Sequence, residues 1–72
     1  MNKQYFYVIQ LYGDVFLNSM VNTHITETRD IVDAWKFTEY EINEYLDNIG
    51  DDLKKIYPNL KILEVECIFR KY

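Results

Sequence analysis

The chain has 72 residues, a net charge of −4 at neutral pH and an aromatic content of 17%. A chain this short supports one small core, so we expect residues 1–72 to form a single domain. One cysteine and one histidine exclude an internal disulfide and a Cys/His zinc site. The many aromatic side chains argue against disorder.

The sequence predicts a soluble, cytoplasmic protein. No apolar stretch approaches the roughly 18 residues that a membrane span requires, and the N-terminal residues lack the pattern of a signal peptide. A lone thiol fits a reducing compartment. The negative net charge argues against direct binding to nucleic acid, which basic patches usually mediate.

The first elements in chain order are two strands joined by a tight turn. Residues 4–12 are rich in aromatic and β-branched side chains, which is typical of a strand. Gly13-Asp14 predicts a two-residue hairpin turn, because glycine accepts a positive φ at the first turn position. Val15 to about Val21 then forms the returning strand.

The segment 22–37 is open to several interpretations. Residues 25–28 fit a short edge strand, a continuation of the second strand after a bulge, or a loop. Residues 30–37 fit a short helical turn with Asp30 as its N-cap.

A helix from about 39 to 56 is the clearest element. Thr38-Glu39-Tyr40-Glu41 has the capping-box pattern. Acidic residues lie in the first turn and Lys54-Lys55 in the last, as the helix dipole favours. Apolar residues recur every three or four positions along one face (Ile42, Tyr45, Leu46, Ile49, Leu53 and Ile56). Pro58 ends the helix.

Residues 60 to about 70 form the last strand, with Leu63, Val65, Cys67 and Phe69 on one face and Ile62, Glu64, Glu66, Ile68 and Arg70 on the other. We expect the first set to meet the helix. The predicted fold is therefore α+β, in the order β-β-α-β: a small antiparallel sheet, made of a hairpin and a C-terminal strand, with one main helix packed on one face.

No residue pattern indicates catalysis, a metal site or a cofactor. His24 has no nucleophile in a recognisable arrangement, so we interpret it as a surface histidine. Cys67 falls on the predicted core face, as a buried structural thiol. The glycines belong to no phosphate-binding motif, and the carboxylates match no calcium loop. We therefore predict a protein that is not an enzyme.

The acidic residues are concentrated in the middle of the chain. Residues 27–52 carry nine carboxylates and two basic side chains, whereas the flanks are basic. Within the helix, carboxylates form a row opposite the apolar face, and the preceding segment extends it: Asp30, Asp33, Glu41, Glu44, Asp47 and Asp51. This row is either an ordinary solvated face or a surface that imitates nucleic-acid phosphates or docks in a basic groove.

A second candidate surface lies on the sheet. One helix covers one sheet face, yet the first strand is apolar on both faces. The uncovered set predicts either a self-association patch, made of Phe6, Val8, Tyr12 and Ile68 together with Ile62, or a face that the segment 22–37 covers.

Four features spread over most of the chain form a recognisable pattern of residue types: Tyr5-Phe6-Tyr7-Val8-Ile9, the hairpin glycine, Asp33-Ala34-Trp35-Lys36-Phe37-Thr38 and Lys61-Ile62-Leu63-Glu64-Val65. In this pattern the chain resembles small bacteriophage-encoded accessory proteins of unassigned function. The resemblance implies a phage or mobile-element protein that acts in the bacterial host cytoplasm, and it implies no catalytic or binding residue.

Two functions follow as hypotheses. The first is a non-enzymatic protein-binding module, an inhibitor of a host nucleic-acid-handling or defence protein, whose acidic helix face binds a basic nucleic-acid-binding protein. The alternative is a structural or assembly protein that forms a homodimer through its aromatic sheet face. Neither involves a membrane or direct contact with nucleic acid.

Overall fold

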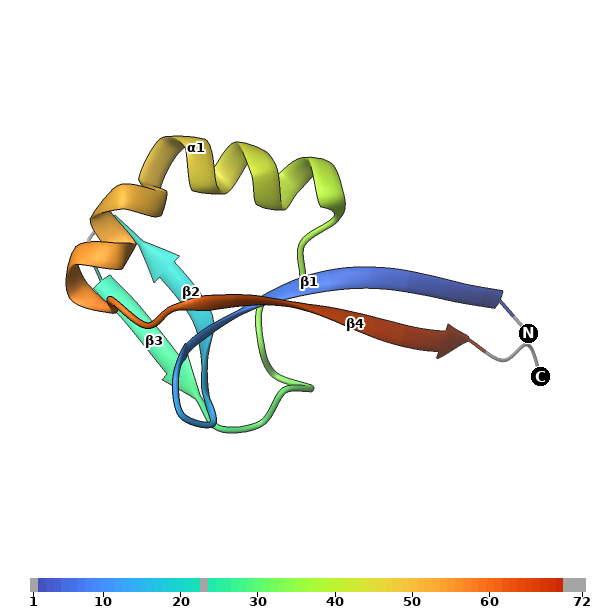
Figure 1. The fold of residues 1–72 in the computed structure, drawn as a ribbon. Helices are drawn as coiled ribbons and strands as arrows, with labels where there is room; N and C mark the ends of the chain where they lie inside the picture. The colour runs from blue at the N-terminus through green and yellow to red at the C-terminus, as the bar shows by residue number, and fades with distance from the viewer. Residues whose placement is uncertain (1, 23, 70–72) are drawn as a thin grey trace.

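The fold is a four-stranded antiparallel sheet with one helix across a face (Figure 1). The computed structural model describes residues 2–22 and 24–69, and at residues 2, 68 and 69 the backbone alone. Its elements are β1 (Asn2–Tyr12), β2 (Val15–Val21), β3 (His24–Thr28), α1 (Glu39–Ile56) and β4 (Lys61–Phe69). The strand order is β3-β2-β1-β4. The predicted α+β class is confirmed, and β3 extends the predicted β-β-α-β order to β-β-β-α-β.

The hairpin between β1 and β2 turns at Gly13-Asp14, as predicted. Tyr12 is paired with Val15 across the turn, and Gly13 has a φ of 49°. Glycine adopts this left-handed conformation without the steric penalty that a Cβ atom brings. The carboxylate of Asp14 also pairs with the guanidinium of Arg29 at 2.6 Å, which ties the residue after β3 to the turn.

The edge strand β3 decides between the three interpretations of residues 25–28. It pairs antiparallel with β2 from Phe16↔Thr28 to Val21↔His24, with an irregularity at Asn18. After β3, the side chain of Asp30 accepts a hydrogen bond from the Val32 amide at 2.9 Å. Asp30 therefore caps a short turn as predicted, but the turn ends before Trp35 and the chain continues extended.

The sheet divides where β1 and β2 separate. β1 pairs with β4 from Asn2↔Phe69 to Gln10↔Lys61, but with β2 at Gln10 and Tyr12 alone. The first half of β1 and the second half of β4 therefore project as a two-stranded ribbon (Figure 1).

The segment 34–37 occupies the space that this separation opens. The Trp35 amide donates to the Leu17 carbonyl of β2 at 3.0 Å. Phe37 and Tyr7 of β1 exchange two backbone hydrogen bonds of 2.7 and 2.9 Å. The chain thereby passes between β1 and β2, from the face below the sheet in Figure 1 to the face that carries α1.

The helix-side core lies between α1 and the sheet. It consists of Ile9, Leu11, Leu17, Phe37, Ile42 and Leu53, each with at most 3% of its surface exposed. α1 spans the predicted residues without interruption, with Thr38 as the N-cap and both hydrogen bonds of the capping box present. Gly50 is buried within it.

A second, smaller core lies on the opposite face. Val8, Phe16 and Ala34 are buried there, and Ile31, Leu63 and Val65 pack against them. The prediction that Leu63 and Val65 meet the helix is therefore wrong, because Ile62 is the β4 residue that packs on the helix-side core. The alternation of β4 separates a more apolar face, with Leu63 and Val65, from a face with Ile62, Glu64 and Glu66, but it does not indicate which of the two the helix covers.

Candidate protein-binding surface

The carboxylates of α1 form an exposed, unneutralised row. Glu39, Glu41, Glu44, Asp47, Asp51 and Asp52 are all exposed. Among the described residues the two ion pairs are Lys3–Glu66 and Asp14–Arg29, so no helix carboxylate is paired with a base of this part of the chain. The row therefore keeps its negative potential at the surface of the molecule.

Glu41 is the carboxylate whose position the fold fixes most firmly. Its Oε1 accepts a hydrogen bond from the Thr38 amide at 2.8 Å, and its own amide donates to the Thr38 hydroxyl at 3.2 Å. The hydrogen bonds from the backbone and the side chain of Thr38 lower the pKa of the Glu41 carboxyl. Glu41 is thus held ionised at the first turn of α1.

Asp30 and Asp33 do not extend this row, which corrects the predicted surface. Both are exposed, but their segment packs through Ile31 and Ala34 on the opposite core. α1 packs on the other sheet face. The sheet therefore separates the two aspartates from Glu41, Glu44, Asp47 and Asp51.

Three aromatic rings that the sequence interpretation did not assign to a site lie beside the acidic row. The ring of Trp35 stacks on that of Phe37, with centroids 4.5 Å apart. The ring of Tyr45 packs edge-on against Trp35 at 5.2 Å and tilted against Phe37 at 5.0 Å. Phe37 is buried, whereas Trp35 and Tyr45 are partly exposed.

Each ring is held by a different part of the fold. Trp35 and Phe37 are fixed by the backbone hydrogen bonds to β2 and β1. Tyr45 comes from the second turn of α1, and its hydroxyl donates to the Met20 sulfur on β2 at 3.3 Å. Burial raises the pKa of this hydroxyl, so Tyr45 stays neutral well above physiological pH. The cluster is therefore held by contacts to β1, β2 and α1.

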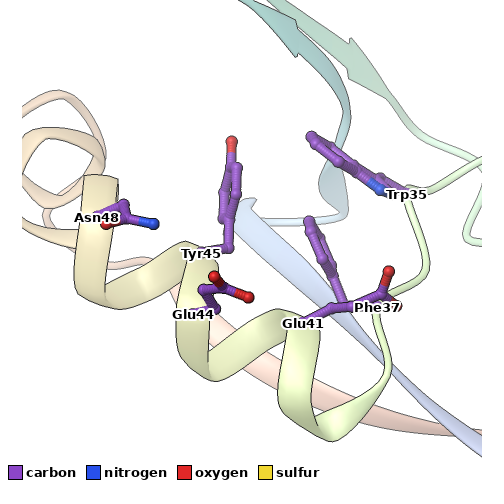
Figure 2. Close-up of a pocket in the computed structure, with 6 residues that line it drawn as sticks. All are labelled: Trp35, Phe37, Glu41, Glu44, Tyr45 and Asn48. Atoms are coloured by element: carbon purple, nitrogen blue, oxygen red, sulfur yellow. The ribbon is translucent and has the colours of Figure 1, made fainter.

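A pocket of about 270 Å³ lies between these rings and the acidic edge of α1. Figure 2 shows Tyr45 and Trp35 on either side of Phe37, with Glu41, Glu44 and Asn48 along the helix. Two members of the acidic row thus border the pocket, while Asp47 and Asp51 lie outside its lining. We call this site the aromatic–acidic pocket.

The sequence held a weak signal for this pocket. Trp35 and Phe37 are two positions apart in an extended segment, so their side chains share a face. Tyr45 lies one helical turn beyond Glu41, on the same side of α1. No sequence pattern, however, indicates that residues 34–37 pass between the strands and so bring both rings to the helix.

The residues predicted for self-association do not form one exposed patch. Val8 has none of its surface exposed, because the segment 29–34 covers it. Phe6 is partly buried, and Tyr12 is exposed at the other end of β1, where its ring stacks on Tyr57. The side chain of Ile68 lies outside the described residues. The alternative in which this segment covers the sheet face is the one that the structure supports.

The remaining candidate residues, His24 and Cys67, lie on the two edge strands of the sheet. His24 is exposed on β3, and Cys67 is a partly buried free thiol on β4. Within residues 2–22 and 24–69, no three His, Cys, Asp or Glu side chains are grouped as a metal site. In that same part of the chain, no helix is long and apolar enough to cross a membrane.

Fold and surface together define a small α+β domain with one acidic helix face and an aromatic pocket at its edge. Comparisons with protein-family models, curated proteins and solved structures found no match to the chain.

Proposed function

We propose that this protein is a non-enzymatic binding module whose acidic helix face docks on a basic protein. The observation that carries the proposal is the row of exposed helix carboxylates, none of which is paired with a base among the described residues. Such a row attracts a basic surface over a distance and speeds encounter with it. The functional surface consists of Glu41, Glu44, Asp47 and Asp51.

The charge density favours docking in a basic groove over imitation of a whole duplex. α1 has 18 residues with six carboxylates and two lysines, so its length of roughly 27 Å carries a net charge of −4, or about one negative charge per 6.8 Å. Duplex DNA carries one per about 1.7 Å of axis. The partner we propose is a nucleic-acid-binding protein, because such proteins present the basic grooves that fit this face.

The resemblance to phage accessory proteins suggests what the binding achieves. Occupation of a basic groove by α1 would block nucleic acid from the same groove, so the module would act as an inhibitor of a host nucleic-acid-handling or defence protein. The site of action would then be the bacterial host cytoplasm.

The test is capture of proteins from a bacterial lysate by three forms of the chain. The helix variant Asp47→Lys/Asp51→Lys reverses two exposed charges on α1 without touching the capping box or the pocket. The control variant Asp33→Lys/Glu66→Lys makes the same change in net charge elsewhere. It breaks the exposed Lys3–Glu66 pair, which contributes at most about 1 kcal/mol.

We expect basic nucleic-acid-binding proteins to be retained by the unmodified chain and by the control variant. The helix variant should lose them, and raised salt should weaken capture because it screens exposed charges. Equal capture by the helix and control variants, with both folded by circular dichroism, would refute the proposal.

A further inference from the structure

We infer that the aromatic–acidic pocket receives an arginine side chain of the protein partner. The inference rests on the proposed function and adds the chemistry by which the partner is recognised. The pocket joins two kinds of wall that favour a cation. Aromatic faces of Trp35 and Tyr45 attract a positive charge through their π systems, and the carboxylates of Glu41 and Glu44 lie at its edge.

The volume of the pocket fits one side chain. At about 270 Å³ it falls below the range of roughly 300–1,000 Å³ that small-molecule sites usually occupy. Its lining includes the buried ring of Phe37 as well as Glu41 and Glu44, so an entering group would be partly desolvated against the ring and lie beside carboxylates. Cation–π attraction is strongest for such partly desolvated cations.

The chain's own nearest cation does not fill the pocket. Lys36 lies between Trp35 and Phe37 in the sequence, but its ammonium donates to the backbone carbonyls of Val32 and Ala34. Neither Glu41 nor Glu44 is in an ion pair with a described residue. The negative edge of the pocket is therefore left for a cation from outside.

Arginine fits these walls better than lysine does. Its guanidinium is planar, so it can stack on an aromatic ring while its edge donates to carboxylates. It is also more weakly hydrated than an ammonium, which lowers the cost of leaving water. The Thr38 hydrogen bonds fix Glu41 at one side, and Glu44 follows one turn later on α1.

The experiment uses the intrinsic fluorescence of Trp35, the single tryptophan of the chain. The full chain is titrated with N-acetyl-arginine amide, N-acetyl-lysine amide and N-acetyl-citrulline amide, the last an uncharged analogue of arginine. We expect a saturable change with the arginine probe, with a dissociation constant on the order of 1 mM, typical of one side chain. The lysine probe should bind at least about threefold more weakly, and the citrulline probe at least about tenfold.

Two matched variants separate the pocket from the general charge of the helix. Glu44→Gln removes a pocket carboxylate and keeps its shape, whereas Asp47→Asn makes the same change outside the lining. We expect Glu44→Gln to weaken the arginine probe about five- to tenfold and Asp47→Asn less than about twofold. Equal effects of the two variants, or equal binding of arginine and citrulline probes, would overturn the inference.

Failure of this inference is distinguishable from failure of the proposed function. If the arginine probe does not bind but Asp47→Lys/Asp51→Lys still abolishes capture of a basic protein, the helix face docks and the pocket does not take arginine. If the probe binds selectively but no basic protein is captured through α1, the pocket assignment holds and the proposed function does not.

Discussion

The rings of Tyr12 and Tyr57 are stacked, with their centroids 6.0 Å apart and their planes 13° from parallel. Both hydroxyls donate to one carboxylate, that of Glu27 on β3, at 3.0 and 2.9 Å. The pair thereby connects the end of β1, the edge strand and the residue that caps the C-terminus of α1. A single exposed glutamate holds together three elements that are far apart in the sequence.

This arrangement makes folding stability sensitive to alkaline pH. The hydrogen bond to Glu27 is the main cause that raises the pKa of Tyr12, and burial followed by the same carboxylate raises that of Tyr57. A raised pKa means that the folded state holds its proton where the unfolded state, at about 10, has lost it. The contribution of these two tyrosines to the free energy of unfolding is therefore fully present below about pH 10. It is lost as the pH rises through their pKa values in the folded state.

Urea denaturation between pH 8 and pH 11 measures this loss, and Glu27→Gln is the variant to compare. We expect tyrosinate absorbance of the variant to appear at lower pH than in the unmodified chain, because the negative charge that opposes ionisation is gone. Its stability should also depend less steeply on pH above about 10. Tyr5→Phe, which alters an exposed tyrosine far from Glu27, should leave the profile of the remaining tyrosines unchanged.

The capping box predicts how much the free energy of unfolding should change when Thr38 is replaced. Thr38→Ala removes the acceptor for the Glu41 amide and should lower the free energy of unfolding by about 1 kcal/mol, whereas Thr38→Ser should change it little. The lowered pKa of Glu41 implies stability that is present above the ordinary pKa of 4.5 and is lost as pH falls through the folded-state value. Urea midpoints at pH 7 and pH 3 measure both effects. An unchanged midpoint for Thr38→Ala would show that the cap contributes nothing.

The two glycines should respond to alanine with opposite signs. At Gly13 the positive φ of 49° penalises any Cβ atom, so Gly13→Ala should cost about 1–2 kcal/mol. At Gly50 a Cβ atom would meet Leu46 at 3.4 Å, an ordinary contact, and alanine is the better helix former. Gly50→Ala should therefore raise the free energy of unfolding by up to about 1 kcal/mol. Thermal and urea denaturation of the two variants test the contrast, which equal signs would contradict.

A substitution at Val8 tests whether this residue belongs to a buried core or to an interface between copies of the chain. Its side chain is fully buried under Ile31 and Ala34, so Val8→Ala should lower the free energy of unfolding by about 1.5–3 kcal/mol. It should leave the sedimentation coefficient of the folded protein unchanged. A variant that keeps its stability but changes its state of association would instead place Val8 in a contact between copies of the chain.

The elements that local sequence determines were predicted well. Thr38 and Glu41, three positions apart, mark the start of α1, and Pro58 follows its end by two positions. Gly13 likewise marks the hairpin turn in which it lies, so no distant contact is needed to recognise these features. The predicted row on α1 likewise follows from spacing alone, and Glu41, Glu44, Asp47 and Asp51 are all exposed.

Features that depend on distant pairings were not predictable in the same way. The face of β4 that meets α1 is set by the loop after Pro58 and by pairing with β1, and Leu63 and Ile62 are equally suited to a core. The positions of Trp35 and Phe37 depend on backbone hydrogen bonds to Leu17 and Tyr7, which no local pattern encodes. Sequence position alone therefore places Asp30 and Asp33 with the helix carboxylates and gives no reason to place the aromatic rings beside them.

The long pairing of β1 with β4 has a consequence for how the molecule folds. The two strands are separated in the chain by the hairpin, the edge strand and the helix, so their alignment closes a long loop before it gains hydrogen bonds. The hairpin and α1 can form from residues that are neighbours in the sequence, whereas the pairing of β1 with β4 cannot. We therefore expect the closing of β1 on β4 to limit the folding rate, with helix signals appearing before the sheet is complete.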